Sequence, residues 1–154
     1  TLITTKWLES KGKIECFFEN VKIVYSKQGP LGNELVTDVL GSATTGMVSF
    51  SMEIYNSSDV TKALRNVRVQ VITERSCLDK MLSDDGSRKS FSSGSIYDDL
   101  LYINVPPKEI IRYKVWFSMR PSEFEGDVLE AVKEVYLFAN DAKGREIKRL
   151  VYKE

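Results

Sequence analysis

The sequence predicts an all-β protein: an immunoglobulin-like antiparallel β-sandwich of about seven strands. Two observations favour this fold class. Apolar and polar residues alternate with a period of two along most of the chain after residue 13. Turn-forming residues separate these runs, and no run is followed by a clear amphipathic helix of the kind that connects parallel strands. A small β-barrel is the alternative.

The chain has the length of one domain. Its 154 residues can bury roughly 68–70% of the extended-chain surface without a metal or a disulfide. We expect residues 14–154 to form the β-sandwich. Residues 1–13 are expected to be a membrane-proximal linker or the remnant of an anchor, because Trp7 precedes Lys11 and Lys13 as at the interfacial end of a membrane helix. A frayed or helical terminus is the alternative.

The first predicted strand is irregular. In residues 14–25 the alternation places Phe17 on the face that also carries Val21 and Ile23, and leaves Phe18 on the opposite face. We therefore expect a bend or a bulge in this strand. A glycine-rich connection follows, with a short edge strand expected at residues 34–39.

The next two predicted strands are regular. Residues 47–55 place four apolar side chains on one face, and residues 66–74 direct Val67, Val69 and Val71 inward. The segment between them, 56–65, is expected to turn through side-chain hydrogen bonds to the local backbone, followed by one helical turn at 60–64.

The second polar stretch, residues 76–96, is rich in Ser, Asp and Gly. We expect a surface loop here, with a short helix at 77–82. Its aspartates do not have the spacing of a calcium-binding EF-hand. Two strands follow at 97–105 and 108–119, interrupted by Pro106 and Pro107, which cannot donate to a β-ladder.

The C-terminal third is predicted to contain a helical excursion and a hairpin. Ser122 and Glu125 have the spacing of a capping box. Residues 133–154 read as two strands around the turn 140–144. The last strand is basic, which favours protection of a sheet edge over binding of nucleic acid or lipid.

Composition excludes most catalytic chemistry. The chain has no histidine, which removes Ser-His-Asp and Cys-His catalysis and His-ligated metals. Its 22 basic and 22 acidic residues cancel, so no overall field attracts nucleic acid. No phosphate-binding loop or nucleophile elbow is present. We predict that the protein is not an enzyme and uses no cofactor or metal; a hydrolase using carboxylates such as Asp98 and Asp99 is a remote alternative.

The two cysteines, Cys16 and Cys77, are 61 positions apart. This spacing fits neither a redox motif nor a zinc site. We expect two reduced thiols, and a disulfide is the alternative if the two side chains lie close together.

Three stretches resemble small bacterial proteins of uncharacterised role, in which an N-terminal membrane helix leads into one β-rich domain. The stretches are IYNSSDVTKALRNVRV, YINVPPKEI and VYLFANDAKGR, and the resemblance covers residues 11–152. It implies an anchor upstream of Thr1, and it implies no activity or ligand.

The resulting functional hypothesis is a non-catalytic interaction module of a membrane-anchored bacterial protein, with its domain in the cytoplasm. The alternative is a structural domain on the outer side of the membrane. A protein partner is expected, and the oligomeric state is left open. Because binding residues concentrate on loops held by a rigid scaffold, the candidate binding residues are those of the two polar loops, namely Asn56, Ser58, Asp59, Asp84, Asp85, Arg88 and Lys89.

Overall fold

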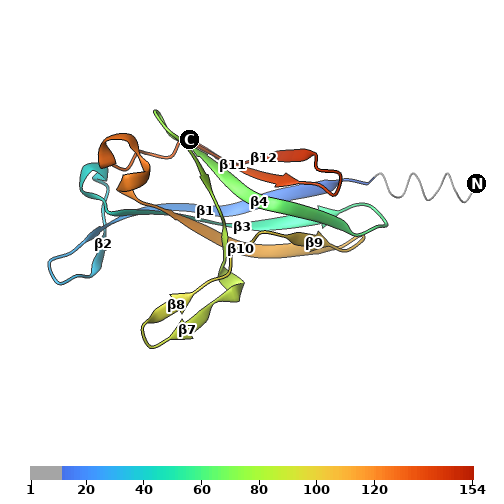
Figure 1. Ribbon diagram of the computed structural model, residues 1–154, viewed down its shortest axis with the longest axis horizontal. Helices are drawn as coiled ribbons and strands as arrows, with labels where there is room; N and C mark the ends of the chain where they lie inside the picture. The colour runs from blue at the N-terminus through green and yellow to red at the C-terminus, as the bar shows by residue number, and fades with distance from the viewer. Residues whose placement is uncertain (1–11) are drawn as a thin grey trace, which may run out of the picture.

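The computed structural model describes residues 12–154, which form two antiparallel sheets packed face to face (Figure 1). The first sheet has the strand order β2-β1-β3-β10-β6, with bounds Glu34–Val36, Ile14–Gln28, Thr45–Asn56, Ile110–Met119 and Ser83–Asp84. The second has the order β12-β11-β4-β5, with bounds Glu146–Lys153, Glu134–Asn140, Lys62–Ile72 and Cys77–Lys80. Strand β9 (Ile103–Val105) also pairs with β4.

These sheets confirm the predicted antiparallel β-sandwich. The short strands β2, β5, β6 and β9 raise the number of strand segments above the seven expected, because the ends of the long strands pair with brief extended pieces of the connections. Within residues 12–154 the helical segments are short 3-10 turns, at Leu40–Ser42, Asp85–Ser87, Pro121–Glu123 and Glu125–Asp127.

The core lies between the two sheets and follows the period-two pattern. On β3 every second side chain is buried, with Val48, Phe50, Met52 and Ile54 at most 3% exposed. From the other sheet, β4 contributes the buried side chains of Val67, Val69 and Val71. Successive side chains of a strand point to opposite faces, so each strand covers the core with one face and meets solvent with the other.

Strand β1 contains the expected bulge, and the bulge changes which residues face the core. The pairing with β3 shifts register between Glu19 and Lys22, and Asn20 adopts a left-handed backbone with φ 55°. Before the bulge Phe18 points inward and meets Phe50 edge to face, with ring centroids 5.9 Å apart. Phe17 is 51% exposed. The prediction that Phe17 shares a face with Val21 and Ile23 was therefore wrong, because the extra residue reverses the alternation.

Two segments expected to be helical are extended instead. Residues 77–80 form β5, which pairs with β4, and residues 62–64 already belong to β4 and pair with β9. Leu82 follows β5 and is fully buried. Pairing with a neighbouring strand and burial of an apolar side chain outweigh the local preference for a helical turn.

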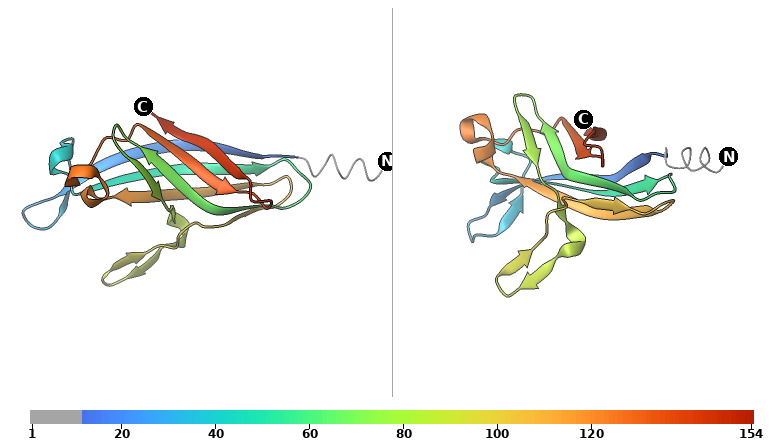
Figure 2. Two further views of the ribbon diagram at one scale, coloured as in Figure 1. Left: turned by 45° about the horizontal axis from the view of Figure 1, so that its top comes forward. Right: turned by 45° about the vertical axis from the view of Figure 1, so that its right-hand side comes forward.

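The predicted polar loop contains a two-stranded arm. Strands β7 (Lys89–Phe91) and β8 (Gly94–Ile96) pair only with each other, and the arm extends away from the sandwich (Figures 1 and 2). Ser87 closes its base: the Ser87 hydroxyl donates to the Asp84 carbonyl (2.7 Å) and accepts from the Asp98 amide (2.8 Å). The base of the arm is therefore fixed to β6.

The C-terminal third agrees with the prediction in outline. Short 3-10 turns replace a longer helix, and the amide of Arg120 donates to the Glu123 carboxylate (2.9 Å), so Glu123 rather than the Ser122 and Glu125 pair stabilises the first turn. The hairpin is confirmed, since β11 and β12 pair along their lengths. The basic strand β12 lies at the edge of its sheet, as expected.

The predicted localisation needs correction. A membrane-anchored protein with a cytoplasmic domain was expected, yet none of the helices in residues 12–154 is long and apolar enough to cross a membrane. Most of the predicted linker or anchor remnant, residues 1–11, lies outside the described residues.

Candidate functional site

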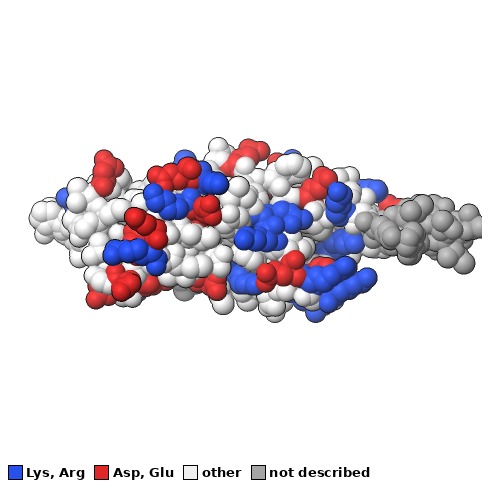
Figure 3. All heavy atoms as spheres, turned by 90° about the horizontal axis from the view of Figure 1, so that it is seen from above, with Lys and Arg blue, Asp and Glu red and all other residues white. Residues whose placement is uncertain are grey.

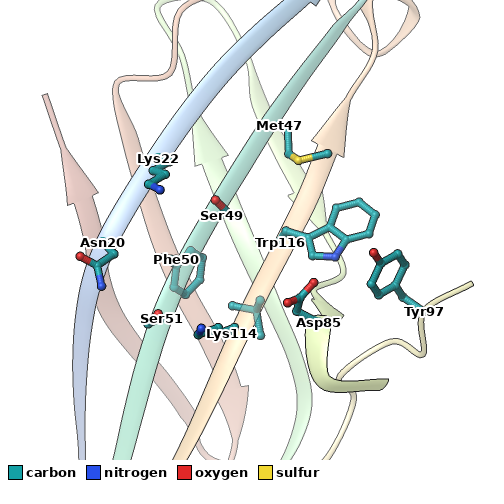
Figure 4. Close-up of a pocket in the computed structure, with 11 residues that line it drawn as sticks. Asn20, Lys22, Met47, Ser49, Phe50, Ser51, Asp85, Tyr97, Lys114 and Trp116 are labelled. Atoms are coloured by element: carbon teal, nitrogen blue, oxygen red, sulfur yellow. The ribbon is translucent and has the colours of Figure 1, made fainter. Parts of the chain in front are cut away.

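A groove crosses the outer face of the first sheet, beside the base of the arm. Its volume is about 720 Å³, within the range of about 300–1,000 Å³ typical of ligand pockets. We call it the outer-face groove. Its lining residues come from β1, β3, β10 and the segment around the arm: Asn20, Lys22, Met47, Ser49, Phe50, Ser51, Asp85, Tyr97, Lys114, Val115 and Trp116 (Figure 4).

The register of the sheet places the floor side chains in two rows across three strands. Lys22 pairs with Ser49, which pairs with Trp116. One row farther along, Ser51 pairs with Lys114 on β10 and with Glu19 on β1. Residues two positions apart on a strand lie on one face and are about 6.8 Å apart, so the two rows have this spacing.

An aromatic wall borders the groove on the side of the arm. The rings of Tyr97 and Trp116 meet edge to face, with centroids 5.0 Å apart and an interplanar angle of 85°. Figure 4 shows Asp85 beside this pair and Lys114 below it. Trp116 is half-buried. Its indole packs against the Tyr97 ring and still meets solvent.

The charges in the groove favour an anionic ligand group. Lys22 and Lys114 contribute two positive charges, and among the described lining residues Asp85 is the one acid. A mechanism with two flanking carboxylates needs a second acid. The groove can therefore hold an aromatic or apolar group beside an acidic one, but it does not bring together the carboxylate pair of a hydrolase.

The predicted binding residues of the second polar loop have different positions. Asp85 lines the outer-face groove. The carboxylate of Asp84 accepts a hydrogen bond from the Gly86 amide (3.0 Å) and so caps the 3-10 turn. Arg88 Nε donates to Ser95 Oγ across the arm (3.1 Å), and Lys89 begins β7 with an exposed side chain.

Asp84 also influences a neighbouring tyrosine. Burial, and to a smaller extent the negative charge of Asp84, raises the pKa of the Tyr113 hydroxyl. Tyr113 therefore stays protonated at neutral pH, and it packs against the core rather than lining the outer-face groove.

The residues predicted in the first polar loop lie elsewhere. Asn56 and Ser58 are fully buried, whereas Asp59 is exposed and lies 3.7 Å from Lys108 Nζ. The backbone amide of Asn56 donates to the Glu109 carbonyl, next to the start of β10. Asp84 pairs with Val115, farther along β10. Six residues of strand separate these two points, or roughly 20 Å, so the structure does not join the two loops into one site.

The sequence interpretation missed the residues on the floor of the groove. Lys22, Ser49, Ser51, Lys114 and Trp116 occupy outward positions on strands, whereas the binding residues were expected on loops. One signal was available: the alternation of 110–117 placed Trp116, a large aromatic residue, on the solvent face. An exposed tryptophan of this kind is more frequent at interaction surfaces than elsewhere on a protein.

Comparison with known proteins gives a consistent result. Residues 12–152 match the YopI Ig-like domain family. The SPbeta prophage-derived uncharacterized protein YopI of Bacillus subtilis (strain 168) is 25% identical over 150 residues, which cover 96% of this chain and 84% of that protein. These matches support the single Ig-like domain that the resemblance implied, and they do not show its membrane helix.

Two solved structures align with most of this chain. One is an uncharacterized β-sandwich protein from Clostridium difficile 630, with 11% identity, a TM-score of 0.41, and coverage of 93% of this chain and 91% of that chain. The other is the apo PmoF2 PCuAC domain, with 13% identity, a TM-score of 0.37, and coverage of 91% and 94%. At these TM-scores neither structure adds an argument about function.

Proposed function

This chain belongs to the YopI Ig-like domain family, and from that premise we propose that it is a non-catalytic interaction module that binds an extended polypeptide segment in the outer-face groove. The observation that carries the proposal is the pair of rows on the groove floor. They combine a fixed tryptophan with two lysines on a rigid sheet, beside the wall made by Tyr97.

The spacing of the rows favours an extended ligand. Alternate side chains of an extended polypeptide are about 6.8 Å apart, which equals the separation of the two rows. Ser49 lies between Lys22 and Trp116, and Ser51 lies beside Lys114; their hydroxyls can hydrogen-bond the backbone of such a segment. A segment lying along β3 can thus present alternate side chains to the two rows.

The chemistry of the rows specifies those side chains. Trp116 favours an aromatic or aliphatic side chain, since buried aromatic contacts supply much of the binding energy at interfaces. Lys114, one row away, favours a carboxylate. The expected recognition element is therefore an acidic residue two positions from an apolar one, in a segment without regular structure of its own.

A non-catalytic role is supported by the acid content of the groove and by the residue types present. Asp85 is the one acid among its described lining residues, and the sequence has no histidine to serve as a proton shuttle. Binding by shape and charge, rather than bond cleavage, is what these side chains favour.

Selection from a displayed library of random heptapeptides tests the proposal. The wild-type protein should enrich peptides that carry Asp or Glu two positions from an aromatic or large aliphatic residue. Synthetic versions of these peptides should bind about tenfold more weakly or worse to the Trp116→Ala and Lys114→Glu variants, since each change removes one anchor of the interaction.

The matched control is Lys148→Glu, the same charge reversal on the outer face of the second sheet, where Lys148 lies over the Tyr136 ring. Selected peptides should bind this variant as they bind the wild type at physiological salt. No enrichment of the motif, or equal weakening by Lys148→Glu and Lys114→Glu, would exclude the outer-face groove as the binding site.

A further inference from the structure

A second hollow lies at the end of the sandwich where β1 and β4 begin and the hairpin of β11 and β12 turns. Its volume is about 770 Å³. It is lined by residues 12–14, 60–64 and 141–143 and by positions 145, 147 and 149 of β12. We call it the basic end pocket.

The pocket concentrates positive charge in a chain that is neutral overall. Five of its described lining residues are basic, namely Lys13, Lys62, Lys143, Arg145 and Arg149, and one, Asp141, is acidic. The whole sequence has 22 basic and 22 acidic residues. Lys and Arg side chains also gather toward this end of the molecule when the second sheet is seen from outside (Figure 3).

Asp141 is already engaged within the hairpin turn. Its carboxylate accepts hydrogen bonds from the backbone amides of Arg145 and Lys143 (2.9 Å each) and from Arg145 Nε (3.2 Å). The backbone bond from Arg145, more than any other contact, lowers the pKa of Asp141. The acid therefore stays ionised, holds Arg145 in place and leaves the pocket with a positive excess.

Strand β12 directs one arginine to the inner side of its sheet. Arg149 pairs with Leu137 and Ile147 pairs with Ala139, and both partners on β11 face the core. Arg149 Nη1 donates to the Lys148 carbonyl (2.9 Å), which fixes the guanidinium. Its charge reaches Cys16 on β1, where it opposes the increase in the thiol pKa that burial causes. Arg149 thus lies at the open side of the sandwich between β12 and β1.

The floor of the pocket is apolar. Ile14 is 7% and Leu64 2% exposed, and Ala63 and Ile147 complete the surface below the basic side chains. An apolar floor beneath several cations suits a ligand with an apolar or aromatic body and a multiply charged anionic group. Guanidinium groups bind phosphate through paired hydrogen bonds, and several cations together favour a polyanion over a single carboxylate.

We infer that the basic end pocket binds a phosphate-bearing organic anion, with the phosphate groups on Arg149, Lys13 and Lys143 and the organic body on Ile14 and Leu64. This site is separate from the outer-face groove: it lies between the two sheets, whereas the groove lies on the outer face of the first. The inference does not depend on the proposed function.

Titration calorimetry of the protein with ADP, pyrophosphate and adenosine, at fixed ionic strength, tests the inference. ADP should bind most tightly, pyrophosphate more weakly, and adenosine not measurably. Arg149→Gln should weaken ADP binding by about tenfold or more, as expected for loss of a charge-assisted contact. Arg149→Lys, which keeps the charge, should retain most of the affinity.

The matched control is Arg112→Gln, an identical change on the outer face of the first sheet, where Arg112 Nε pairs with Glu53 (2.7 Å). It should leave ADP binding unchanged. Equal weakening by both Arg-to-Gln variants would reduce the effect to general surface charge and overturn the inference. Absence of binding by both ADP and pyrophosphate would also overturn it. An Arg149→Gln variant that aggregates but binds ADP normally would overturn it as well, since Arg149 would then serve to protect the sheet edge.

Discussion

Asn56 holds together a loop that the sequence suggested as a binding surface. Its side-chain amide donates to the carbonyl oxygens of Val60 (2.7 Å) and Val105 (2.9 Å), and its side-chain oxygen accepts from the hydroxyl of Ser58 (2.6 Å). Buried polar groups need such partners because water cannot replace them. The side chains of Asn56 and Ser58 are fully buried, so these contacts stabilise the loop.

Replacement of Asn56 by Ala should therefore destabilise the protein. It removes buried hydrogen bonds to the Val60 and Val105 carbonyls and to the Ser58 backbone amide, although the Ser58 hydroxyl and the Val60 carbonyl still bond each other (2.8 Å). We expect the free energy of unfolding to fall by about 2–4 kcal/mol. Urea denaturation measures the loss. Asp59→Ala is the control in the same loop, where the carboxylate is exposed, and it should change stability by less than about 0.5 kcal/mol. Equal effects of the two changes would contradict the structural role of Asn56.

Glu130 is a buried acid stabilised by hydrogen bonds. Burial alone would raise its pKa, but bonds from the hydroxyls of Ser76 and Thr73 (2.9 Å each) and from the amide of Arg75 (3.1 Å) lower the pKa below the usual glutamate value. These bonds join the segment before β11 to the turn between β4 and β5.

The lowered pKa of Glu130 predicts a loss of stability in acid. The ionised carboxylate contributes its full stabilisation above the unfolded-state pKa of about 4.3, and this contribution is lost as pH falls through the lower folded-state pKa. The Glu130→Gln variant should lose stability at pH 7 and show a flatter decline between about pH 5 and pH 2 than the wild type. Urea midpoints across this range decide the matter; parallel curves for the two proteins would show that Glu130 does not titrate as described.

At the scale of elements, the bulge in β1 determines which side chains support the core. Asn20 takes a left-handed conformation that asparagine tolerates better than most residues. The extra residue lets Phe18 on one side of the bulge, and Val21 and Ile23 on the other, all face inward. Without it, one half of the strand would expose its apolar face.

Adjacent phenylalanines provide a direct check on the bulge. Phe18→Ala should reduce the free energy of unfolding by about 2 kcal/mol or more, because it removes packing against Phe50 and the core. Phe17→Ala removes a side chain that is 51% exposed and should cost less than half as much. Chemical denaturation of both variants measures the difference. A larger loss for Phe17→Ala than for Phe18→Ala would contradict this position of the bulge.

The elements that could be predicted from the sequence are those with long, regular alternation. The inward residues of β3 and β4 follow directly from period two, as does the C-terminal hairpin. Strand β6 could not be predicted, because Ser83 becomes extended only through pairing with β10, which is remote in sequence. Strand β5 pairs with the preceding strand β4, but its run from Cys77 is too short to show long, regular alternation. The groove was missed for a related reason: its floor is assembled by the register of three strands.

At the scale of the whole molecule, the two cysteines belong to different sheets. Cys16 lies on β1 of the first sheet and is partly buried, whereas Cys77 lies on β5 of the second and is exposed. Both are free thiols, as expected. Burial raises the pKa of the Cys16 thiol, and the charge of Arg149 only partly offsets this effect.

Thiol labelling of the native protein should therefore be biphasic. Cys77 should react quickly with an aromatic disulfide reagent at pH 8, and Cys16 slowly, because a buried thiol with a raised pKa forms little thiolate. Both should react at one fast rate after unfolding in urea, giving two thiols per chain. The Cys77→Ser variant assigns the phases. A count below two without reductant would contradict the separation of the cysteines.

The connection between β5 and β6 affects how the molecule responds to force. The chain passes from the edge of the second sheet to the edge of the first across Met81 and Leu82 alone, and Leu82 is buried where it crosses. Its carbonyl also accepts from the Leu100 amide (2.8 Å). Such a short, anchored crossing opposes shear between the layers, since any sliding would extract Leu82 from the core. We therefore expect a load applied to one layer to be transmitted to the other through this crossing.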